Sequence, residues 1–232
     1  MDDPSKTKSG GGCLAKLVSL ILLAGTCALA AALFFISQPQ TLNDVGGYGQ
    51  APLGADPRDL KTVLNSALER GYPVAITETE INQWLGKTLI AKQGGLLASQ
   101  VSLKRVWVRL CDGHAEVIME RSIFGRPFTV SMFVKIEQIQ GARGVRTEIH
   151  RHGGPYHENV SKPLRGGRFG KLVVPQGFLI LVMPAYAKLA DIYYEEIRLA
   201  LQEMARIRIE PDRLLLESRE PSGDPSLLPQ TF

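Results

Sequence analysis

Residues 17–36 read LVSLILLAGTCALAAALFFI, and this stretch decides the organisation of the chain because it contains no charged residue. At about 1.5 Å per residue, a helix of this length covers roughly 30 Å, the thickness of the hydrocarbon layer of a bilayer. The stretch therefore predicts one transmembrane helix. The alternative is a cleaved signal peptide, since residues 28–30, Ala-Leu-Ala, have the spacing of a cleavage site. Residues 31–36 stay apolar beyond that site, which favours a retained signal-anchor.

The flanks of this stretch indicate its orientation. Lys6, Lys8 and Lys16 precede it, and no Lys or Arg follows it until Arg58. Positive charge accumulates on the cytoplasmic side of membrane helices. We therefore expect residues 1–16 to form a cytoplasmic tail and the main domain to lie on the extracytoplasmic side of the cell (inner) membrane.

The rest of the chain divides by composition into three parts. Residues 37–55 are rich in Pro, Gly, Gln and Asn, as a flexible stalk would be. Residues 56–217 are long enough for one ordinary hydrophobic core. Residues 218–232 contain three prolines and few side chains to bury, so we expect a disordered tail.

The first part of the predicted domain is helical. A stripe of apolar residues ends at Gly71 and predicts one short helix. A second short helix is expected to begin with the capping box Thr77-Glu78-Thr79-Glu80, in which Thr77 and Glu80 bond each other's backbone amides through their side chains.

The periodicity then changes from 3.6 to 2, which together with the helices predicts an α+β fold. We expect an antiparallel β-meander of about four strands over residues 97–151, with a hairpin turn at Asp112-Gly113. A long packed helix over residues 177–204 and a C-terminal β-hairpin around Pro211-Asp212 complete the domain.

The clearest predicted strand has one apolar and one mostly polar face. The two faces carry Phe128, Val130, Met132, Val134 and Ile136 on the apolar side and Thr129, Ser131, Lys135 and Glu137 mostly on the other.

A basic, glycine-rich segment precedes the long helix. From Arg143 to Lys171 there are seven Lys or Arg against two acids, and Arg165, Arg168 and Lys171 come just before the apolar run 172–183. Cations can bind lipid phosphates and apolar side chains can contact acyl chains, so this segment is a candidate headgroup contact. The alternative is a soluble loop joined to an ordinary core helix.

Signals for catalysis are weak. His150, His152 and His157 have strand-and-turn spacing that could hold zinc, although an ordinary solvated strand face is the favoured interpretation. The sequence has no Gly-x-Ser-x-Gly elbow, phosphate-binding loop or dinucleotide fingerprint. We therefore expect no catalytic residues, no cofactor and no enzymatic activity, with a zinc-dependent hydrolase as the minority interpretation.

The positions of the cysteines and the net charge argue against a disulfide-stabilised domain and a nucleic-acid-binding protein. Cys13 and Cys27 lie at or in the predicted membrane helix, so Cys111 is alone outside and no disulfide scaffold is expected. A single thiol of this kind is more often a buried filler than a nucleophile. The formal net charge of +4 is mild, and no nucleic-acid partner is expected.

Residues 72–85, YPVAITETEINQWL, resemble the "thr-glu-x-glu-leu-asn" start of YpmS-like bacterial membrane proteins and, more distantly, tubular lipid-binding and AsmA-like domains. Residues 124–127, FGRP, and 170–175, GKLVVP, match the families' "phe-gly-x-pro" and "gly-x-leu-x-x-pro" in the same order. The resemblance covers about residues 72–216. It implies a bacterial, non-enzymatic, extracytoplasmic domain whose curved sheet wraps a long helix and leaves an apolar groove for lipid.

Two hypotheses follow. The leading one is a single-span bacterial envelope protein whose periplasmic domain binds lipid or another amphiphile, with Arg165, Arg168 and Lys171 as headgroup contacts. Its candidate groove residues are Phe128, Val130, Met132, Val134, Ile136, Phe178 and Val182. The alternative is a protein-interaction or scaffolding module of a bacterial envelope complex, and a sheet and helix that pack without a channel would favour it.

Overall fold

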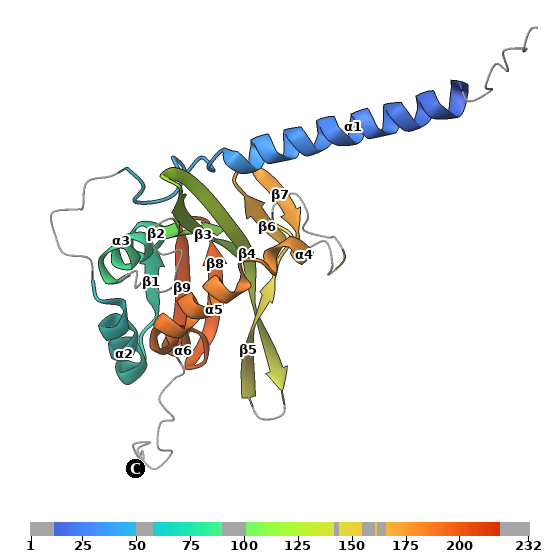
Figure 1. Ribbon diagram of the computed structural model, residues 1–232. Coiled ribbons are helices and arrows are strands. Elements are labelled where there is room, and N and C mark those ends of the chain that lie inside the picture. Colours follow the sequence, from blue (N-terminus) through green and yellow to red (C-terminus); the bar gives the residue numbers. More distant parts are fainter. Residues whose placement is uncertain are drawn as a thin grey trace, which may run out of the picture.

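The structure is a computed structural model that describes residues 12–49, 58–89, 101–141, 144–154, 161 and 166–218. Side chains are described for the same residues except 12–13, 101–102, 141 and 144. An N-terminal helix leads into one mixed α+β domain, so the predicted fold class is confirmed (Figure 1).

Helix α1 (Gly12–Ser37) projects away from the rest of the molecule. Its segment Leu14–Ser37 is 24 residues long, and among the described residues α1 is the one helix long and apolar enough to cross a membrane. Two of its hydroxyls bond within the helix: Thr26 donates to the Leu22 carbonyl and Ser37 to the Phe34 carbonyl, each at 2.8 Å. Such internal pairing is what a hydrocarbon environment requires of polar groups.

Two short helices open the domain, as predicted. Helix α2 (Leu60–Arg70) ends at Gly71 in the left-handed conformation, and α3 (Glu78–Thr88) follows strand β1 (Val74–Thr77). The capping box at the start of α3 is confirmed. The Thr77 hydroxyl accepts from the Glu80 amide at 3.2 Å, and the Glu80 carboxylate accepts from the Thr77 amide at 2.9 Å.

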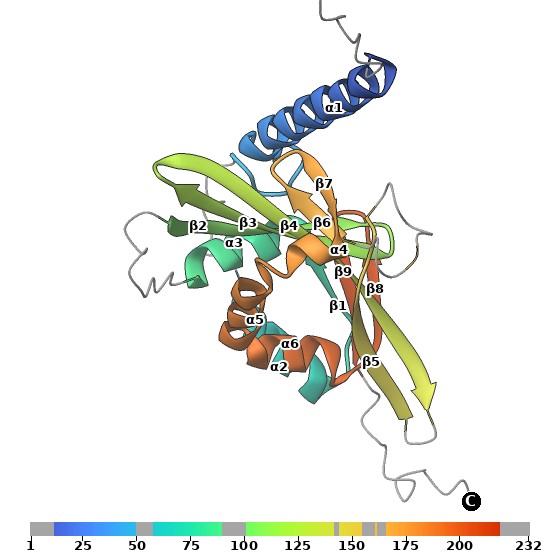
Figure 2. The same ribbon diagram turned by 45° about the vertical axis from the view of Figure 1, so that its right-hand side comes forward.

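The main sheet has six antiparallel strands: β2 (Val101–Cys111), β3 (His114–Ile123), β4 (Arg126–Gly141), β5 (Gly144–Arg151), β6 (Gly166–Phe169) and β7 (Leu172–Pro175). Their order is β2-β3-β4-β6-β7, and β5 pairs with the second half of β4 to form a projecting arm (Figure 2). The four-strand meander and its turn at Gly113 are confirmed. The short strands β6 and β7 were not predicted from the glycine-rich connection.

The predicted C-terminal hairpin is confirmed as β8 (Met204–Glu210) and β9 (Arg213–Ser218), which join β1 in a second sheet of order β1-β9-β8. One side chain ties the two sheets together. Gln138 of β4 accepts from the Ile207 amide at 2.9 Å and donates to the Ala205 carbonyl at 3.3 Å. The side-chain amide thereby takes the place of a neighbouring strand along the edge of β8.

The prediction of one long helix over residues 177–204 is wrong. The segment forms three helices, α4 (Gln176–Leu179), α5 (Met183–Ile192) and α6 (Tyr194–Leu201). Pro184 lies in the first turn of α5, where a missing amide hydrogen costs nothing, and it cannot continue the preceding helix. A second break falls at Tyr193, which has φ −108° and ψ 26°.

The main core lies between the sheets and helices α2, α3, α5 and α6 (Figure 2). Tyr186 of α5 is inserted against the main sheet, and its hydroxyl is 3.0 Å from the Val117 carbonyl and 3.2 Å from the Val130 carbonyl. Burial raises the pKa of this phenol. The same core includes Leu64, Ile76, Trp84, Val106, Met119, Val130, Leu199 and Leu216.

Residues 38–49, which we call the strap, differ from the flexible stalk expected over 37–55. They cross the opposite face of the main sheet between α1 and α3 (Figure 1). Leu42 and Val45 are buried with Trp107 and Ile118 in a second core. The main sheet is therefore covered on both faces, and Thr129 and Ser131, on the polar face of β4, are buried beneath the strap.

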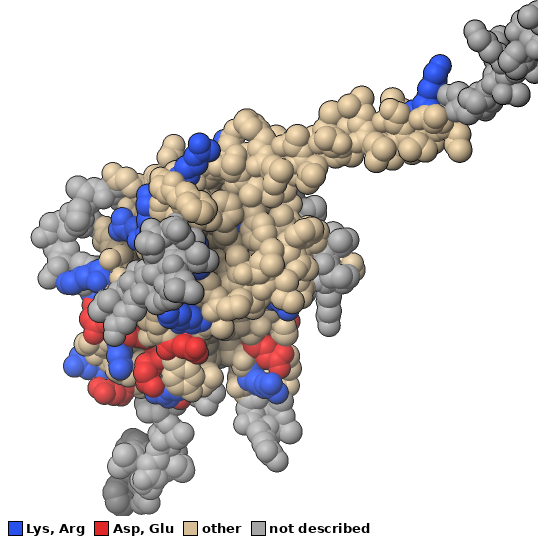
Figure 3. Space-filling view, in the orientation of Figure 1, with Lys and Arg blue, Asp and Glu red and all other residues tan. Residues whose placement is uncertain are grey.

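Charged side chains are unevenly distributed over the surface seen in Figure 3. Lys, Arg, Asp and Glu gather over the left and lower parts of the domain. The flank directly below α1 shows mostly uncharged side chains. The domain thus presents a largely uncharged side next to its apolar N-terminal helix.

Candidate functional site

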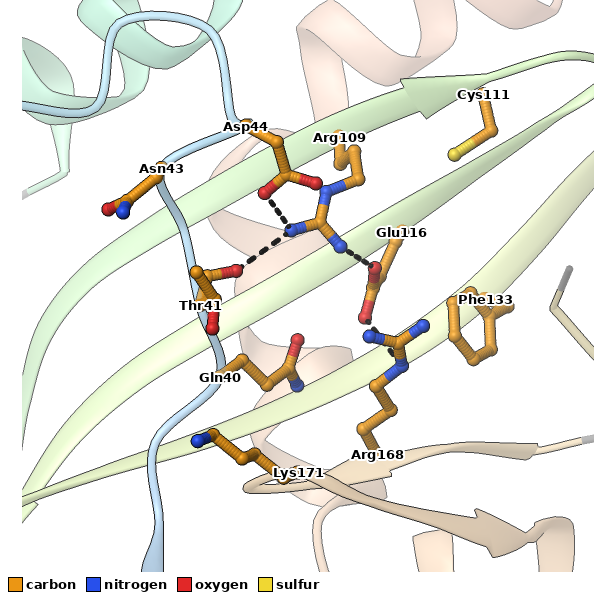
Figure 4. A pocket seen from close by; sticks show the side chains of 10 residues that line it. All are labelled: Gln40, Thr41, Asn43, Asp44, Arg109, Cys111, Glu116, Phe133, Arg168 and Lys171. Atoms are coloured by element: carbon orange, nitrogen blue, oxygen red, sulfur yellow. Dashed lines mark hydrogen bonds and ion pairs between the residues drawn. The ribbon is translucent and has the colours of Figure 1, made fainter.

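A polar pocket of about 470 Å³ lies between the strap and the main sheet, and we call it the strap pocket (Figure 4). The strap contributes one wall, β2, β3 and β4 form the floor, and β6 with the β6–β7 turn forms the opposite wall. Its lining residues are Gln40, Thr41, Asn43, Asp44, Arg109, Cys111, Glu116, Phe133, Arg168 and Lys171.

Glu116 of β3 is the centre of the polar contacts in this pocket. It is 1% exposed, and its carboxylate accepts from Arg109 at 2.6 Å and from the Ser131 hydroxyl at 2.5 Å. Arg109 also donates to Asp44 at 2.8 Å and to the Thr41 carbonyl at 3.1 Å. A buried carboxylate needs such partners, and here Arg109 joins it to the strap.

Gln40 fastens the beginning of the strap to β4. Its backbone amide donates to the Thr129 hydroxyl at 2.8 Å, and its side-chain amide donates to the Ser131 hydroxyl at 3.1 Å. Because Ser131 in turn donates to Glu116, one continuous chain of hydrogen bonds joins the strap to the centre of the sheet.

Glu78 and Asn82 of α3 fasten the other end of the strap. The two oxygens of Glu78 accept from the Gly46 and Leu110 amides, each at 2.5 Å. Burial raises the pKa of Glu78, against the lowering effect of these two bonds. Asn82 donates to the Gly46 carbonyl at 2.9 Å. Both residues belong to residues 77–82, TETEIN, in which only the capping pair Thr77 and Glu80 was predicted to have a role.

The structure brings together two of the three predicted headgroup residues. The Arg168 guanidinium lies over the Phe133 ring, 5.5 Å from its centroid, and its Nε is 3.8 Å from Glu116. Lys171 is exposed at the rim, and its backbone amide donates to the Phe35 carbonyl of α1 at 3.0 Å. Arg165 lies outside the described residues.

Buried polar atoms of the pocket-lining residues that have no hydrogen-bond partner within the described part of the chain include the acceptor Oε1 of Gln40 and the donor Nε of Arg109. Buried polar groups of this kind are normally satisfied by a ligand or by water. Three cations against two carboxylates also leave the lining with one net positive charge. The pocket is thus complementary to a ligand that carries both an anionic oxygen and a hydroxyl group.

Cys111 also lines the strap pocket and is half-buried. Burial, and after it the negative charge of Glu116, raises the pKa of its thiol. A thiol that stays protonated at neutral pH is a poor nucleophile. Cys111 is therefore a reporter of access to the pocket rather than a reactive group in it.

The seven candidate groove residues lie in three different places. Val130 is in the main core, and Phe128, Met132 and Val182 pack against that core. Val134 and Ile136 pack against a smaller cluster of Leu110, Ala115 and Ile209. Phe178 is 56% exposed. The sheet and helix residues expected to line one groove are therefore mostly packing residues.

The histidines considered as zinc ligands have separate surroundings. His150 is 3.2 Å from Glu148 and 3.8 Å from Glu137 on the surface of the β4–β5 arm. His152 is buried, stacks on His114 with ring centroids 4.8 Å apart, and accepts from the Gly154 amide at 3.0 Å. His157 lies outside the described residues. Within the described ranges, no group of three or more His, Cys, Asp or Glu could hold a metal ion.

Comparison with known proteins leaves the chain without an assigned family. No family model matches the sequence, and no curated protein matches it. Among solved structures, one that is matched is the crystal structure of lipopolysaccharide binding protein, at 12% sequence identity and a TM-score of 0.20. The match covers 66% of this chain and 40% of that one. A TM-score this low indicates no common fold, so the match assigns neither fold nor function.

Proposed function

We propose that this chain is a single-span protein of the bacterial cell (inner) membrane, with its N-terminus in the cytoplasm and its domain on the extracytoplasmic, periplasmic side. We further propose that the domain is not an enzyme and binds a lipid or another amphiphile at the membrane surface. The ligand class that fits best is an anionic amphiphile with a hydroxylated headgroup, bound through the strap pocket.

The observation that carries this proposal is the position of the strap pocket relative to α1. Gln40 lines the pocket only three positions after Ser37, the last residue of α1. Three residues of extended chain reach about 10 Å, and the headgroup layer on each side of a bilayer is roughly 5–7 Å thick. If α1 spans the membrane, the near rim of the pocket lies at the level of the headgroups.

The chemistry of the pocket supports a headgroup over an acyl chain. Eight of its ten lining residues are polar or charged, and Lys171 at the rim is exposed near the end of α1. Lysine and arginine bind phosphate, and a hydroxyl can donate to the unpaired Gln40 oxygen. Phosphatidylglycerol offers both groups, whereas phosphatidylcholine offers the phosphate without a headgroup hydroxyl.

Cys111 provides the test. The full chain carrying Cys13→Ser and Cys27→Ser, purified in a non-ionic detergent, has one thiol, which can be alkylated at alkaline pH. Short-chain phosphatidylglycerol is expected to slow alkylation of Cys111 more than short-chain phosphatidylcholine does. Glycerol 1-phosphate and inorganic phosphate are tested in the same way, to distinguish protection by a lipid from protection by a soluble phosphate. Protection by glycerol 1-phosphate equal to that by the lipid would show that the acyl chains are irrelevant and would contradict an amphiphile.

A matched pair of lysine variants ties protection to the pocket. Lys171→Gln removes the exposed rim cation and should abolish the preference for phosphatidylglycerol. Lys61→Gln removes an equally exposed cation from α2, outside the pocket, and should leave the preference intact. Equal alkylation rates with and without either lipid would overturn the proposed binding.

One observation favours the alternative function, a protein-interaction or scaffolding module. Strand β5 pairs with β4 along one side, and among the described strands none pairs with its other side. The arm also exposes Ile139 and Ile149, at 47% and 53%. An open strand edge with apolar neighbours can accept a strand from a partner. Lys substitution of Ile149 should then lower recovery of the chain in envelope complexes without changing Cys111 protection.

A further inference from the structure

Residues 178–181, which we call the apolar tip, comprise the last two residues of α4 and the first two residues of the turn that leads to α5. Phe178, Ile180 and Leu181 are 56%, 72% and 74% exposed, whereas Leu179 is fully buried. Single exposed apolar residues are common on soluble proteins. Three large ones within four consecutive positions form a patch of the kind that contacts a membrane or a partner.

The apolar tip is held firmly in place by its buried member. A Cβ added to Gly167 of β6 would lie 3.1 Å from the Leu179 side chain, which shows how closely the tip packs on the sheet. Two backbone bonds close the turn, from the Leu181 amide to the Phe178 carbonyl at 3.4 Å and from the Val182 amide to the Leu179 carbonyl at 2.9 Å. The three exposed side chains are therefore presented outward by an ordered turn.

The position of the apolar tip relative to α1 is set by the β6–β7 turn. The Lys171 amide bonds the Phe35 carbonyl of α1 at 3.0 Å, and a Cβ on Gly170 would overlap the carbonyl oxygens of Ile36 and Gln38. This close contact fixes the end of α1 on the sheet. Figures 1 and 2 show α4, which contains Phe178 and Leu179 of the tip, below α1 and displaced from its domain end toward the side on which α1 projects. A bilayer crossed by α1 would therefore lie on the side of the tip.

The charges around the apolar tip fit a bilayer. The flank of the domain below α1 is largely uncharged (Figure 3). A shallow hollow of about 500 Å³ beside the tip is lined by Arg151, Gln176, Gly177, Ile180 and Met183, with a cation and no carboxylate among them. Lys171, at the opposite end of β7 from α4, adds a second cation at the β6–β7 turn, beside the end of α1. Apolar side chains bordered by cations are what the interface of an anionic membrane favours.

We propose that the apolar tip inserts into the leaflet from which α1 emerges, so that the domain is held against the membrane at two points. This inference rests on the proposed membrane anchoring by α1 and not on ligand binding in the strap pocket. The binding partner of the apolar tip is the lipid bilayer itself. The two contacts together fix the orientation of the domain, so that the strap pocket faces the headgroups.

Tryptophan fluorescence in proteoliposomes tests the insertion. The full chain carrying Ile180→Trp or Leu181→Trp is reconstituted in vesicles of phosphatidylcholine and phosphatidylglycerol, with or without bromine on the acyl chains. Both positions are exposed, so the substitutions are compatible with the fold. The native Trp84 and Trp107 are buried, and their emission is subtracted using the wild-type chain. The added emission is expected to shift to shorter wavelength and to be largely lost in brominated vesicles.

Tyr194→Trp is the matched control, because Tyr194 is 56% exposed like Phe178 but lies on α6. Its emission should stay at the wavelength typical of water and survive in brominated vesicles. Water-like, unquenched emission from both tip variants would overturn the insertion and would assign the tip to a protein partner or a second copy of the chain. That outcome leaves Cys111 protection by lipid unaffected, so failure of this inference and failure of the proposed function are distinguishable.

Discussion

The side chain of Asn82 is paired with the backbone of Val108 as a neighbouring strand would be. Its amide nitrogen donates to the Val108 carbonyl at 2.8 Å, and its oxygen accepts from the Val108 amide at 2.7 Å. Asn82 is fully buried and bonds the Gly46 carbonyl as well. It therefore closes the open edge of β2, attaches α3 to it and holds the strap at the same time.

Asn82→Ala should lower the free energy of unfolding by at least about 2 kcal/mol, because it leaves the Val108 backbone groups and the Gly46 carbonyl without their partner. Denaturant titration of the full chain in detergent measures this. Lys61→Ala on the exposed side of helix α2 is the control and should change the value by less than about 0.5 kcal/mol. Similar losses in the two variants would contradict the role of Asn82.

The two acidic partners of Arg109 should differ sharply in their contribution to stability. Glu116 is buried, so Glu116→Gln removes the negative charge that the guanidinium groups of Arg109 and Arg168 both face and should cost about 3–5 kcal/mol. The Asp44 side chain is 68% exposed, so Asp44→Asn should cost about 0–1 kcal/mol. Thermal melting of both variants beside the wild type checks this. Equal losses would indicate that the ion pair with Glu116 is not part of the folded core.

Glu80 should give part of the stability of the domain a dependence on pH. Burial acts to raise the pKa of Glu80, but its hydrogen bonds to Thr77 and Arg58 outweigh burial and hold the pKa below the ordinary value of 4.5. A lowered pKa contributes stability that is present above pH 4.5 and is lost as the pH falls through the folded-state value. The glutamine side chain of Glu80→Gln can still cap the helix. The free energy of unfolding of this variant should therefore fall less between neutral and acidic pH than that of the wild type.

The strap should detach locally when one of its buried anchors is removed. Leu42→Ala deletes apolar contact with the second core and should cost about 2–3 kcal/mol. Because Trp107 lies in that core, its emission should shift to longer wavelength in a Trp84→Phe background. Asn43→Ala, which alters an exposed strap residue, is the control. An unchanged Trp107 spectrum in Leu42→Ala would contradict packing of the strap.

Gly170→Ala should uncouple α1 from the domain. Gly170 has φ 55°, and a Cβ there would overlap the carbonyls at the end of α1. The substitution should therefore abolish the bond between Lys171 and Phe35 and weaken quenching of Ile180→Trp by brominated lipid. Gly49→Ala also places a Cβ on a positive φ but meets no atom of the described residues within 4 Å, so it separates backbone strain from lost docking. Equal quenching in the Gly170 and Gly49 variants would show that the contact does not orient the domain.

Features that depend on nearby residues could be predicted from the sequence. The capping box of Thr77 and Glu80, the turn at Gly113 and the alternating strand β4 each need only a few consecutive residues to be recognised. Strands β6 and β7 could not be predicted this way, since each has four residues and the first begins with Gly166-Gly167. Both glycines are needed there, because a Cβ on either would overlap a carbonyl of a neighbouring strand.

The candidate site depends on contacts that no local pattern reveals. Gln40 bonds Thr129 and Ser131, 89 and 91 positions further along the chain. The strap has a polar composition, and its two buried apolar residues, Leu42 and Val45, are too few to establish a helix or strand period. Clustered charge did point to Arg168 and Lys171. Arg109 and Glu116 were missed because an alternating strand with one polar face is normally expected to be wet on that face.

The strap also determines where the folded unit starts. From composition alone, the domain is expected to begin at residue 56, and a water-soluble version of it would be started there. Such a version would expose the side chains of Trp107 and Ile118 to solvent. It would also remove the hydrogen bonds of Arg109 to Asp44 and to the Thr41 carbonyl. A shortened chain intended for crystallisation or ligand screening should therefore begin at residue 38, immediately after the last turn of the apolar helix.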